Sequence, residues 1–206
     1  MRPALPAGPL DGAAVLAVFE QAGALRRGHF QLTSGRHSDT YLQCALVLQW
    51  PEVAAALGAA LAEPWRGRVD LVAAPAMGGV VIGHEVARAL GVRFVFAERA
   101  ARGGRELTLR RGFAAEAGER ALVVEDVVTT GGSALETAAL LERAGAGVAG
   151  IAAIVGRTPP GARPPEGLST LVALQAPAWA PEACPACAQG VPLSSPGSRR
   201  LGRPSA

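Results

Sequence analysis

The amino-acid sequence predicts an α/β protein: a mostly parallel sheet with helices on both faces. Short apolar runs alternate with helical patterns from residue 69 to residue 155, as they do in βαβ units. The runs are nearly continuous rather than alternating with polar residues, which is typical of strands covered on both faces. With 206 residues, 50% of them hydrophobic, the chain can form one domain with a sizeable core.

An N-terminal segment precedes the alternating pattern. We expect an amphipathic helix over residues 11–27, because apolar residues recur at helical spacing and Asp11 is a suitable N-cap. The elements expected next are strands at 29–32 and 40–43 and a helix from Pro51 to about residue 62.

The alternating part supplies the remaining elements. We expect strands at 69–74, 93–97, 121–127, 148–155 and 168–174, and helices at 80–90 and 133–144. Residues 98–112 are polar, contain glycine and are rich in arginine, so they predict a long mobile loop or ribbon. Residues 177–206 have no regular pattern and are expected to be irregular.

Composition narrows the class of protein. The net charge is +3, from 20 basic and 17 acidic residues, and the basic residues are dispersed apart from a cluster at 99–111. A nucleic-acid partner is therefore not required, and a polyanionic small substrate explains the cluster equally well. No apolar run reaches the roughly 18 residues of a membrane span, and the N-terminus lacks a secretory signal. We expect a cytoplasmic protein without a membrane partner.

Two of the three cysteines form a C-x-x-C motif, Cys184 to Cys187. With no second pair and no histidine near it in the sequence, the motif is half of a zinc site. Two chains of a dimer could complete such a site. We expect instead a reducible disulfide or two plain thiols.

The strongest functional signal is at residues 122–133. An apolar strand ends in Glu125 and Asp126, and a Thr-Thr-Gly-Gly-Ser loop then leads into a helix. Backbone amides in such a loop can bind a phosphate, and hydroxyl groups add donors. Carboxylates next to a phosphate site suit a phosphorylated sugar, because they can bind its hydroxyl groups.

This segment resembles the 5-phosphoribosyl-1-pyrophosphate (PRPP) motif of type I phosphoribosyltransferases. The resemblance implies that Asp126 and Glu125 are catalytic and bind the ribose hydroxyls, Asp126 being the more important. It also implies Mg²⁺ as cofactor, held mainly by PRPP oxygens and water near Asp126. The residues expected to bind the PRPP phosphate are Thr129, Thr130, Gly131, Gly132 and Ser133.

A second loop, residues 75–79, follows an earlier strand and resembles the pyrophosphate loop of the same family. The resemblance implies that Ala76, Met77 and Gly78 bind PRPP and that the peptide bond Ala76–Met77 is cis. An ordinary loop between strand and helix is the alternative.

The arginine-rich segment matches the family's mobile loop in position. The resemblance implies that Arg99 binds PRPP, that Arg102 takes part in catalysis, and that the loop reaches the partner's site in a homodimer. Many relatives have lysines and a histidine in this loop, whereas this chain has arginine, a poor proton donor. A solvated charge run is the alternative.

Residues 32–42 resemble the "S-G-R-x-S" segment of the orotate phosphoribosyltransferases, which forms part of a hood over the base. Tyr41 is expected to stack on orotate, and Thr33 and Thr129 to contact it. Arg157 follows another strand and is expected to face the orotate carboxylate, since a planar guanidinium can form two parallel hydrogen bonds. The alternatives are a hood core residue for Tyr41 and a surface charge for Arg157.

The resemblance covers about residues 11–200 and implies a single phosphoribosyltransferase domain. Its parts are a small hood, mainly 11–45, a core of about 50–157 and an irregular C-terminal extension, 158–206. The implied reaction transfers the 5-phosphoribosyl group from PRPP to orotate, giving orotidine 5′-monophosphate and pyrophosphate in pyrimidine biosynthesis. A PRPP-sensing regulator and an enzyme acting on another base are the alternatives.

Overall fold

The computed structural model describes residues 2–32, 34–99, 106–159 and 161–196. The strands of the main sheet are β3 (Leu71–Pro75), β4 (Arg93–Arg99), β5 (Leu107–Leu109), β6 (Arg120–Val128), β7 (Gly147–Thr158) and β8 (Leu168–Gln175). Their order is β5-β4-β3-β6-β7-β8. Neighbouring strands pair in parallel except β4 and β5, which are antiparallel. The predicted mostly parallel sheet is confirmed.

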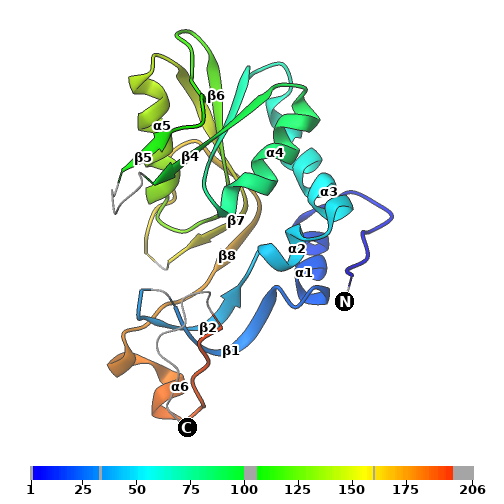
Figure 1. Ribbon diagram of the computed structural model, residues 1–206. Coiled ribbons are helices and arrows are strands. Elements are labelled where there is room, and N and C mark those ends of the chain that lie inside the picture. The colour runs from blue at the N-terminus through cyan, green and yellow to red at the C-terminus, as the bar shows by residue number, and fades with distance from the viewer. Residues whose placement is uncertain (1, 33, 100–105, 160, 197–206) are drawn as a thin grey trace.

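Helices cover both faces of this sheet (Figure 1). The helices over one face are α3 (Pro51–Ala62) and α4 (Gly78–Leu90), and the helix over the other is α5 (Gly132–Arg143). Along β6, Leu122 and Val124 belong to the core under α3 and α4, while Ala121 and Val123 belong to the core under α5. The strand is buried on both sides, which explains its continuous apolar run.

The first helix, α1 (Gly12–Gln21), is shorter than the 11–27 expected from the sequence. Asp11 does cap it, accepting a hydrogen bond from the amide of Ala14 at 2.9 Å. The helix ends because Gly23 takes a left-handed conformation with φ +67°, and strand β1 begins two residues later. Since α1 packs against β8, it belongs to the core of the domain rather than to the hood.

The hood is an antiparallel pair of strands, β1 (Leu25–Gln31) and β2 (His37–Leu42), which form a separate sheet (Figure 1). The C-terminal segment lies against this hairpin: β-bridges join Phe30 to Ser194 and His37 to Trp179. Among the described residues, the short helices are α2 (Ala45–Leu48), η1 (Glu63–Trp65), η2 (Pro181–Ala183) and α6 (Pro185–Ala188).

The segment expected as an irregular extension from residue 158 therefore has two parts. Strand β8, expected from the sequence at residues 168–174, completes the main sheet beside β7, so the core continues to Gln175 rather than ending near residue 157. Residues 177–196 continue onto the hood and contain the short helices η2 and α6. The second part is joined to the hairpin by backbone hydrogen bonds, a contact that its own sequence pattern does not reveal.

Strands β6 and β7 do not pair evenly along their length. The pairing passes from Ala121 opposite Val148 to Leu122 opposite Gly150, so β7 has one extra residue at this point. Beyond it the pairing is regular to Val128 and Gly156. No helix in the described part of the chain is long and apolar enough to cross a membrane.

Candidate active site

The acid pair lies on β6 at the carboxyl edge of the main sheet, where parallel α/β proteins bind ligands. The sequence placed the pair at the end of the strand, but β6 continues for two more residues to Val128. Glu125 and Asp126 therefore keep the alternation of a strand. Glu125 lies on the side of α5 and Asp126 on the side of α4.

Glu125 is nearly buried, with 7% of its surface exposed. Its Oε1 accepts a hydrogen bond of 2.6 Å from the hydroxyl of Ser133, the second residue of α5. Burial, reinforced by the charge of Asp126, raises the pKa of Glu125 to about 7, although the Ser133 hydrogen bond acts in the opposite direction. The Glu125 carboxyl group thus changes charge near neutral pH.

We expect Glu125→Gln to remove a pH dependence of stability. Because the folded protein holds the Glu125 proton more tightly than the unfolded chain, this group stabilises the fold below its ordinary pKa of 4.5 and loses that contribution as the pH rises through about 7. The free energy of unfolding of the variant, relative to the native protein, should rise by about 2–3 kcal/mol between pH 4.5 and pH 8. Urea unfolding at both pH values measures it. The control is Glu116→Gln, which changes an exposed glutamate. Equal changes in the two variants would show that the pH dependence does not come from the raised pKa of Glu125.

Asp126 faces the loop that precedes α4. A Cβ atom on Gly78 would lie 2.7 Å from Asp126 Oδ1, and one on Gly79 would lie 2.7 Å from the carbonyl oxygen of Val124. Glycine at both positions lets the first turn of α4 approach β6 closely. Burial raises the pKa of Asp126, while hydrogen bonds from backbone amides, including that of Val127, act against it.

The loop at residues 75–79 has the backbone expected from the resemblance, since the peptide bond Ala76–Met77 is cis. The amide of Ala76 donates to the carbonyl of Ala97 at 2.7 Å, which ties this loop to the end of β4. Met77 is 81% exposed, and it lines a hollow together with Gly78 and Asp126. An anion bound there would lie next to the Asp126 carboxylate.

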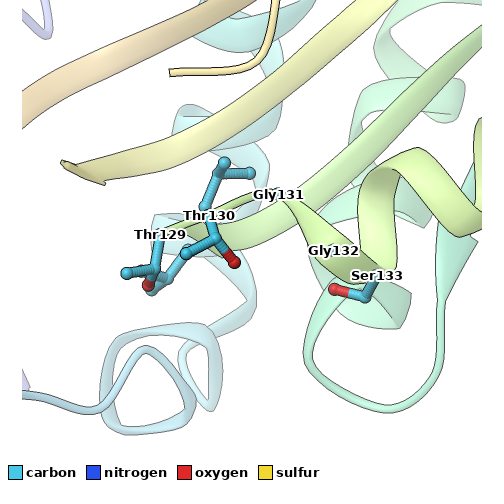
Figure 2. A pocket seen from close by; sticks show the side chains of 7 residues that line it. Thr129, Thr130, Gly131, Gly132 and Ser133 are labelled. Atoms are coloured by element: carbon cyan, nitrogen blue, oxygen red, sulfur yellow. The ribbon is translucent and has the colours of Figure 1, made fainter. Parts of the chain in front are cut away.

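The Thr129–Ser133 loop forms a pocket of its own between β6 and α5. Figure 2 shows the labelled residues along the turn that leads into the helix. Gly131 adopts φ +80°, a left-handed conformation that suits glycine, and Gly132 begins α5. The first amides of a helix have no partner within it, so this pocket can bind an anion such as a phosphate.

Arg157 connects the core to the hood. It lies near the end of β7, and one guanidinium nitrogen donates to Ser38 Oγ at 3.0 Å and to the carbonyl of Thr40 at 3.3 Å. Burial lowers the pKa of Arg157, and the nearby charge of Asp39 partly compensates. Arg157 is thus held between two parts of the protein rather than solvated as a surface charge.

Tyr41 packs within the hood. Its ring lies 5.6 Å, centroid to centroid, from that of Phe30, and its hydroxyl donates to the carbonyl of Pro196 at 3.4 Å. These contacts agree with the hood-core alternative, and stacking on a base stays a prediction. Thr33 and Arg102 lie outside the described residues.

Arg99 ends β4 and forms two hydrogen bonds of 2.8 Å with the carboxylate of Glu136 on α5. The same carboxylate accepts a bond of 2.7 Å from the amide of Leu107 at the start of β5. One acidic side chain therefore holds both strands that flank residues 100–105. Binding of PRPP by Arg99 stays a prediction.

Two residues near the site were not singled out from the sequence. Ser38 receives the Arg157 hydrogen bond, and its hydroxyl donates to the carbonyl of Pro177 at 2.8 Å. The buried thiol of Cys44 lies 3.9 Å from the carbonyl of Asp126. Ser38 stands within the hood motif and could have been chosen for that reason, whereas no local pattern marks Cys44.

The fold and the two loops at residues 75–79 and 129–133 are those of a phosphoribosyltransferase domain. The family model described as "Phosphoribosyl transferase domain" matches residues 46–174. The chain belongs to this family. Within it, the chain belongs with the orotate phosphoribosyltransferases: it is 47% identical over 188 residues to the orotate phosphoribosyltransferase of Pelotomaculum thermopropionicum, covering 91% of this chain and 97% of the relative. The corresponding protein of Caldanaerobacter subterraneus is 46% identical, with the same coverage of both chains.

Solved structures agree with this assignment. Orotate phosphoribosyltransferase from Aeropyrum pernix matches with a TM-score of 0.64 and 25% identity, over 77% of this chain and 92% of that one. An adenine phosphoribosyltransferase from Rhodothermus marinus matches with a TM-score of 0.62 and 24% identity, over 79% of this chain and 99% of that one. The second likeness concerns the fold alone.

Proposed function

We propose that this protein transfers the 5-phosphoribosyl group of PRPP to orotate, giving orotidine 5′-monophosphate and pyrophosphate in pyrimidine biosynthesis. One observation carries the proposal: the acid pair of β6 stands between the Thr129–Ser133 pocket and the cis loop at Ala76–Met77. A substrate with phosphate groups at both ends of a ribose fits two anion-binding loops on one edge of a sheet. The family membership supports the same reaction.

The reaction needs alignment of reactants and stabilisation of the leaving group rather than a covalent nucleophile. Pyrophosphate leaves C1 of the ribose while a nitrogen of the base attacks it, through a transition state with positive charge on the ring. Thr129 to Ser133 bind the 5-phosphate, and the amides near Met77 bind the pyrophosphate. Asp126 and Glu125 hold the ribose hydroxyls and favour the cationic ring. Arg99 and Arg102 neutralise the leaving group.

Mg²⁺ is the proposed cofactor, and the residues present fit it. Mg²⁺ prefers oxygen ligands, usually one or two carboxylates with substrate oxygens and water, and Asp126 is a carboxylate beside a hollow lined by Met77 and Gly78. When bound there with PRPP, the ion would supply positive charge to the leaving pyrophosphate.

At the base, the Arg157 guanidinium binds the orotate carboxylate. The contacts with Ser38 and Thr40 support this role, because they fix the guanidinium at the junction of core and hood. Tyr41, Thr33 and Thr129 complete the proposed base site.

A homodimer belongs to the same proposal, with residues 98–112 reaching the partner's site. Its support is the family membership, together with the position of this segment, which matches the family's mobile loop. A cytoplasmic location and small-molecule substrates, without nucleic acid, complete the proposal.

The test is an ultraviolet absorbance assay of orotate consumption with PRPP and Mg²⁺, with adenine, hypoxanthine, xanthine and uracil as controls. We expect rapid loss of orotate that depends on PRPP and no turnover of the other bases. Turnover of a different base would show that this base, rather than orotate, is the substrate. PRPP binding without turnover of any base would contradict the proposed enzymatic activity and favour a PRPP sensor.

A further inference from the structure

Two histidines and two cysteines, residue types that commonly bind metals, meet at the hood, away from the phosphate loops. They are His29 on β1, His37 on β2, Cys184 just before α6, and Cys187 on α6. One nitrogen or sulfur atom from each lies within 4.8 Å of all the others. Three of the four residues are buried, with 2–5% of their surface exposed, and Cys187 is exposed.

The separations within the cluster match a tetrahedral zinc ion. His29 Nε2 lies 3.0 Å from His37 Nδ1 and 3.4 Å from Cys184 Sγ. Cys187 Sγ lies 3.2 Å from His37 Nδ1 and 3.6 Å from His29 Nε2. Zinc bonds of ~2.0–2.1 Å to nitrogen and ~2.3 Å to sulfur place tetrahedral ligand atoms roughly 3.3–3.8 Å apart. These four separations are equal to or slightly shorter than the tetrahedral values, and the other pairs of ligand atoms lie within 4.8 Å, so the side chains need only small movements to accept the ion.

A contact outside the cluster selects the tautomer of the neutral His29 ring. Its Nδ1 lies 2.8 Å from the carbonyl oxygen of Val191. A carbonyl can only accept, so Nδ1 carries the proton and Nε2 presents its lone pair to the cluster. This arrangement is the one that orients histidine ligands in metal sites.

We propose that His29 Nε2, His37 Nδ1, Cys184 Sγ and Cys187 Sγ bind one Zn²⁺ ion. Both cysteines are free thiols in the structure, and each releases its proton to solvent when its sulfur binds the metal. Thiolate and imidazole ligands favour zinc over the hard Mg²⁺ ion. Four protein ligands leave no open position, so the ion is structural rather than catalytic.

The two free thiols agree with one of the two outcomes expected from the sequence, plain thiols rather than a disulfide. Neither a Cys184–Cys187 disulfide nor a site completed by a second chain is needed, because histidines of the same chain stand next to the C-x-x-C motif. The ion would join the hairpin to residues 177–196, beside the backbone bonds between His37 and Trp179. That hairpin also holds Arg157 through Ser38.

The first test uses the full chain, purified without added metal and dialysed against a weak chelator. We expect about one zinc per chain by mass spectrometry of the metal. Replacement by Co²⁺ should give the visible bands of a tetrahedral site and a thiolate charge-transfer band. A protein that retains no zinc and takes up neither ion overturns the proposal, and so does a Cys184–Cys187 disulfide in freshly purified protein.

Variants then assign the ligands. Cys187→Ser changes the exposed ligand, so it disturbs the fold least, and His37→Ala removes a buried one. Each should weaken zinc binding by at least about 100-fold, and Cys187→Ser should also weaken the charge-transfer band. His84→Ala, on the exposed surface of α4, is the matched control and should bind zinc like the native protein. Circular dichroism checks that each variant is folded.

A readout that does not depend on any substitution is limited proteolysis of the native protein. Removing the ion with a strong chelator should speed cleavage within residues 177–196 several-fold, and added Zn²⁺ should restore resistance. Native zinc affinity in folded Cys187→Ser, or cleavage unchanged by the chelator, would overturn the proposal.

Discussion

Asp126→Asn is expected to lower turnover by at least about 100-fold while the protein stays folded. The substitution keeps the shape of the side chain but removes the negative charge that would face the ribose and the cationic transition state. Asp126 lines the hollow beside Met77 and Gly78, so its loss should act on kcat more than on folding. Steady-state kinetics with saturating PRPP, orotate and Mg²⁺ measure the change.

The matched control is Asp70→Asn. Asp70 precedes β3 at the opposite end of the sheet and pairs with Arg120 through hydrogen bonds of 2.8 and 2.9 Å. The partner lowers the pKa of Asp70 to about 2, so the control also removes an ionised aspartate. Its turnover should be unchanged. Similar losses in both variants, or full turnover in Asp126→Asn, would contradict the role of the acid pair.

Arg157→Ala is expected to raise the KM for orotate roughly 10- to 100-fold and to leave the KM for PRPP nearly unchanged. A hydrogen bond to a charged group is worth about 1.5–3 kcal/mol, and the substitution removes the guanidinium without touching either phosphate loop. Initial rates measured over a grid of both substrates separate the two constants.

Arg163→Ala, an exposed arginine in the segment after β7, is the control for a general loss of positive charge. Arg157→Lys retains the charge and loses the planar fork, so it should recover only part of the orotate affinity. Equal changes in the KM of both substrates would show that Arg157 stabilises the hood and does not bind the orotate carboxylate.

The sequence predicted best where local chemistry and tertiary structure agree. Helix α3 spans Pro51–Ala62 as expected, because proline at the first position starts a helix without losing a hydrogen bond. The motif at residues 122–133 was predicted as strand, loop and helix, and it is β6, the pocket loop and α5. The cis bond at Ala76–Met77 is confirmed, but it came from the family resemblance rather than from the residues.

The predictions failed where distant parts of the chain meet. The sequence gives no sign that His29 and His37 stand next to cysteines about 150 residues away. The predicted first helix was too long because Leu25 fits a helical pattern as well as a strand, and only the turn at Gly23 decides between them. Residues 177–196 are mostly irregular, as expected, but their own composition gives no sign of the backbone bonds that join them to the hairpin.

The extra residue in β7, at Ala149, is absorbed where it occurs. Val148 lies opposite Ala121 and Gly150 lies opposite Leu122, and from there the two strands stay in register to Val128 and Gly156. The bulge thus keeps the alternation of side chains on β7 matched to that on β6, and Arg157, one residue beyond Gly156, faces Ser38. A residue inserted or deleted between Gly150 and Arg157, with no bulge to absorb the change, would turn the Arg157 side chain to the other face of the sheet.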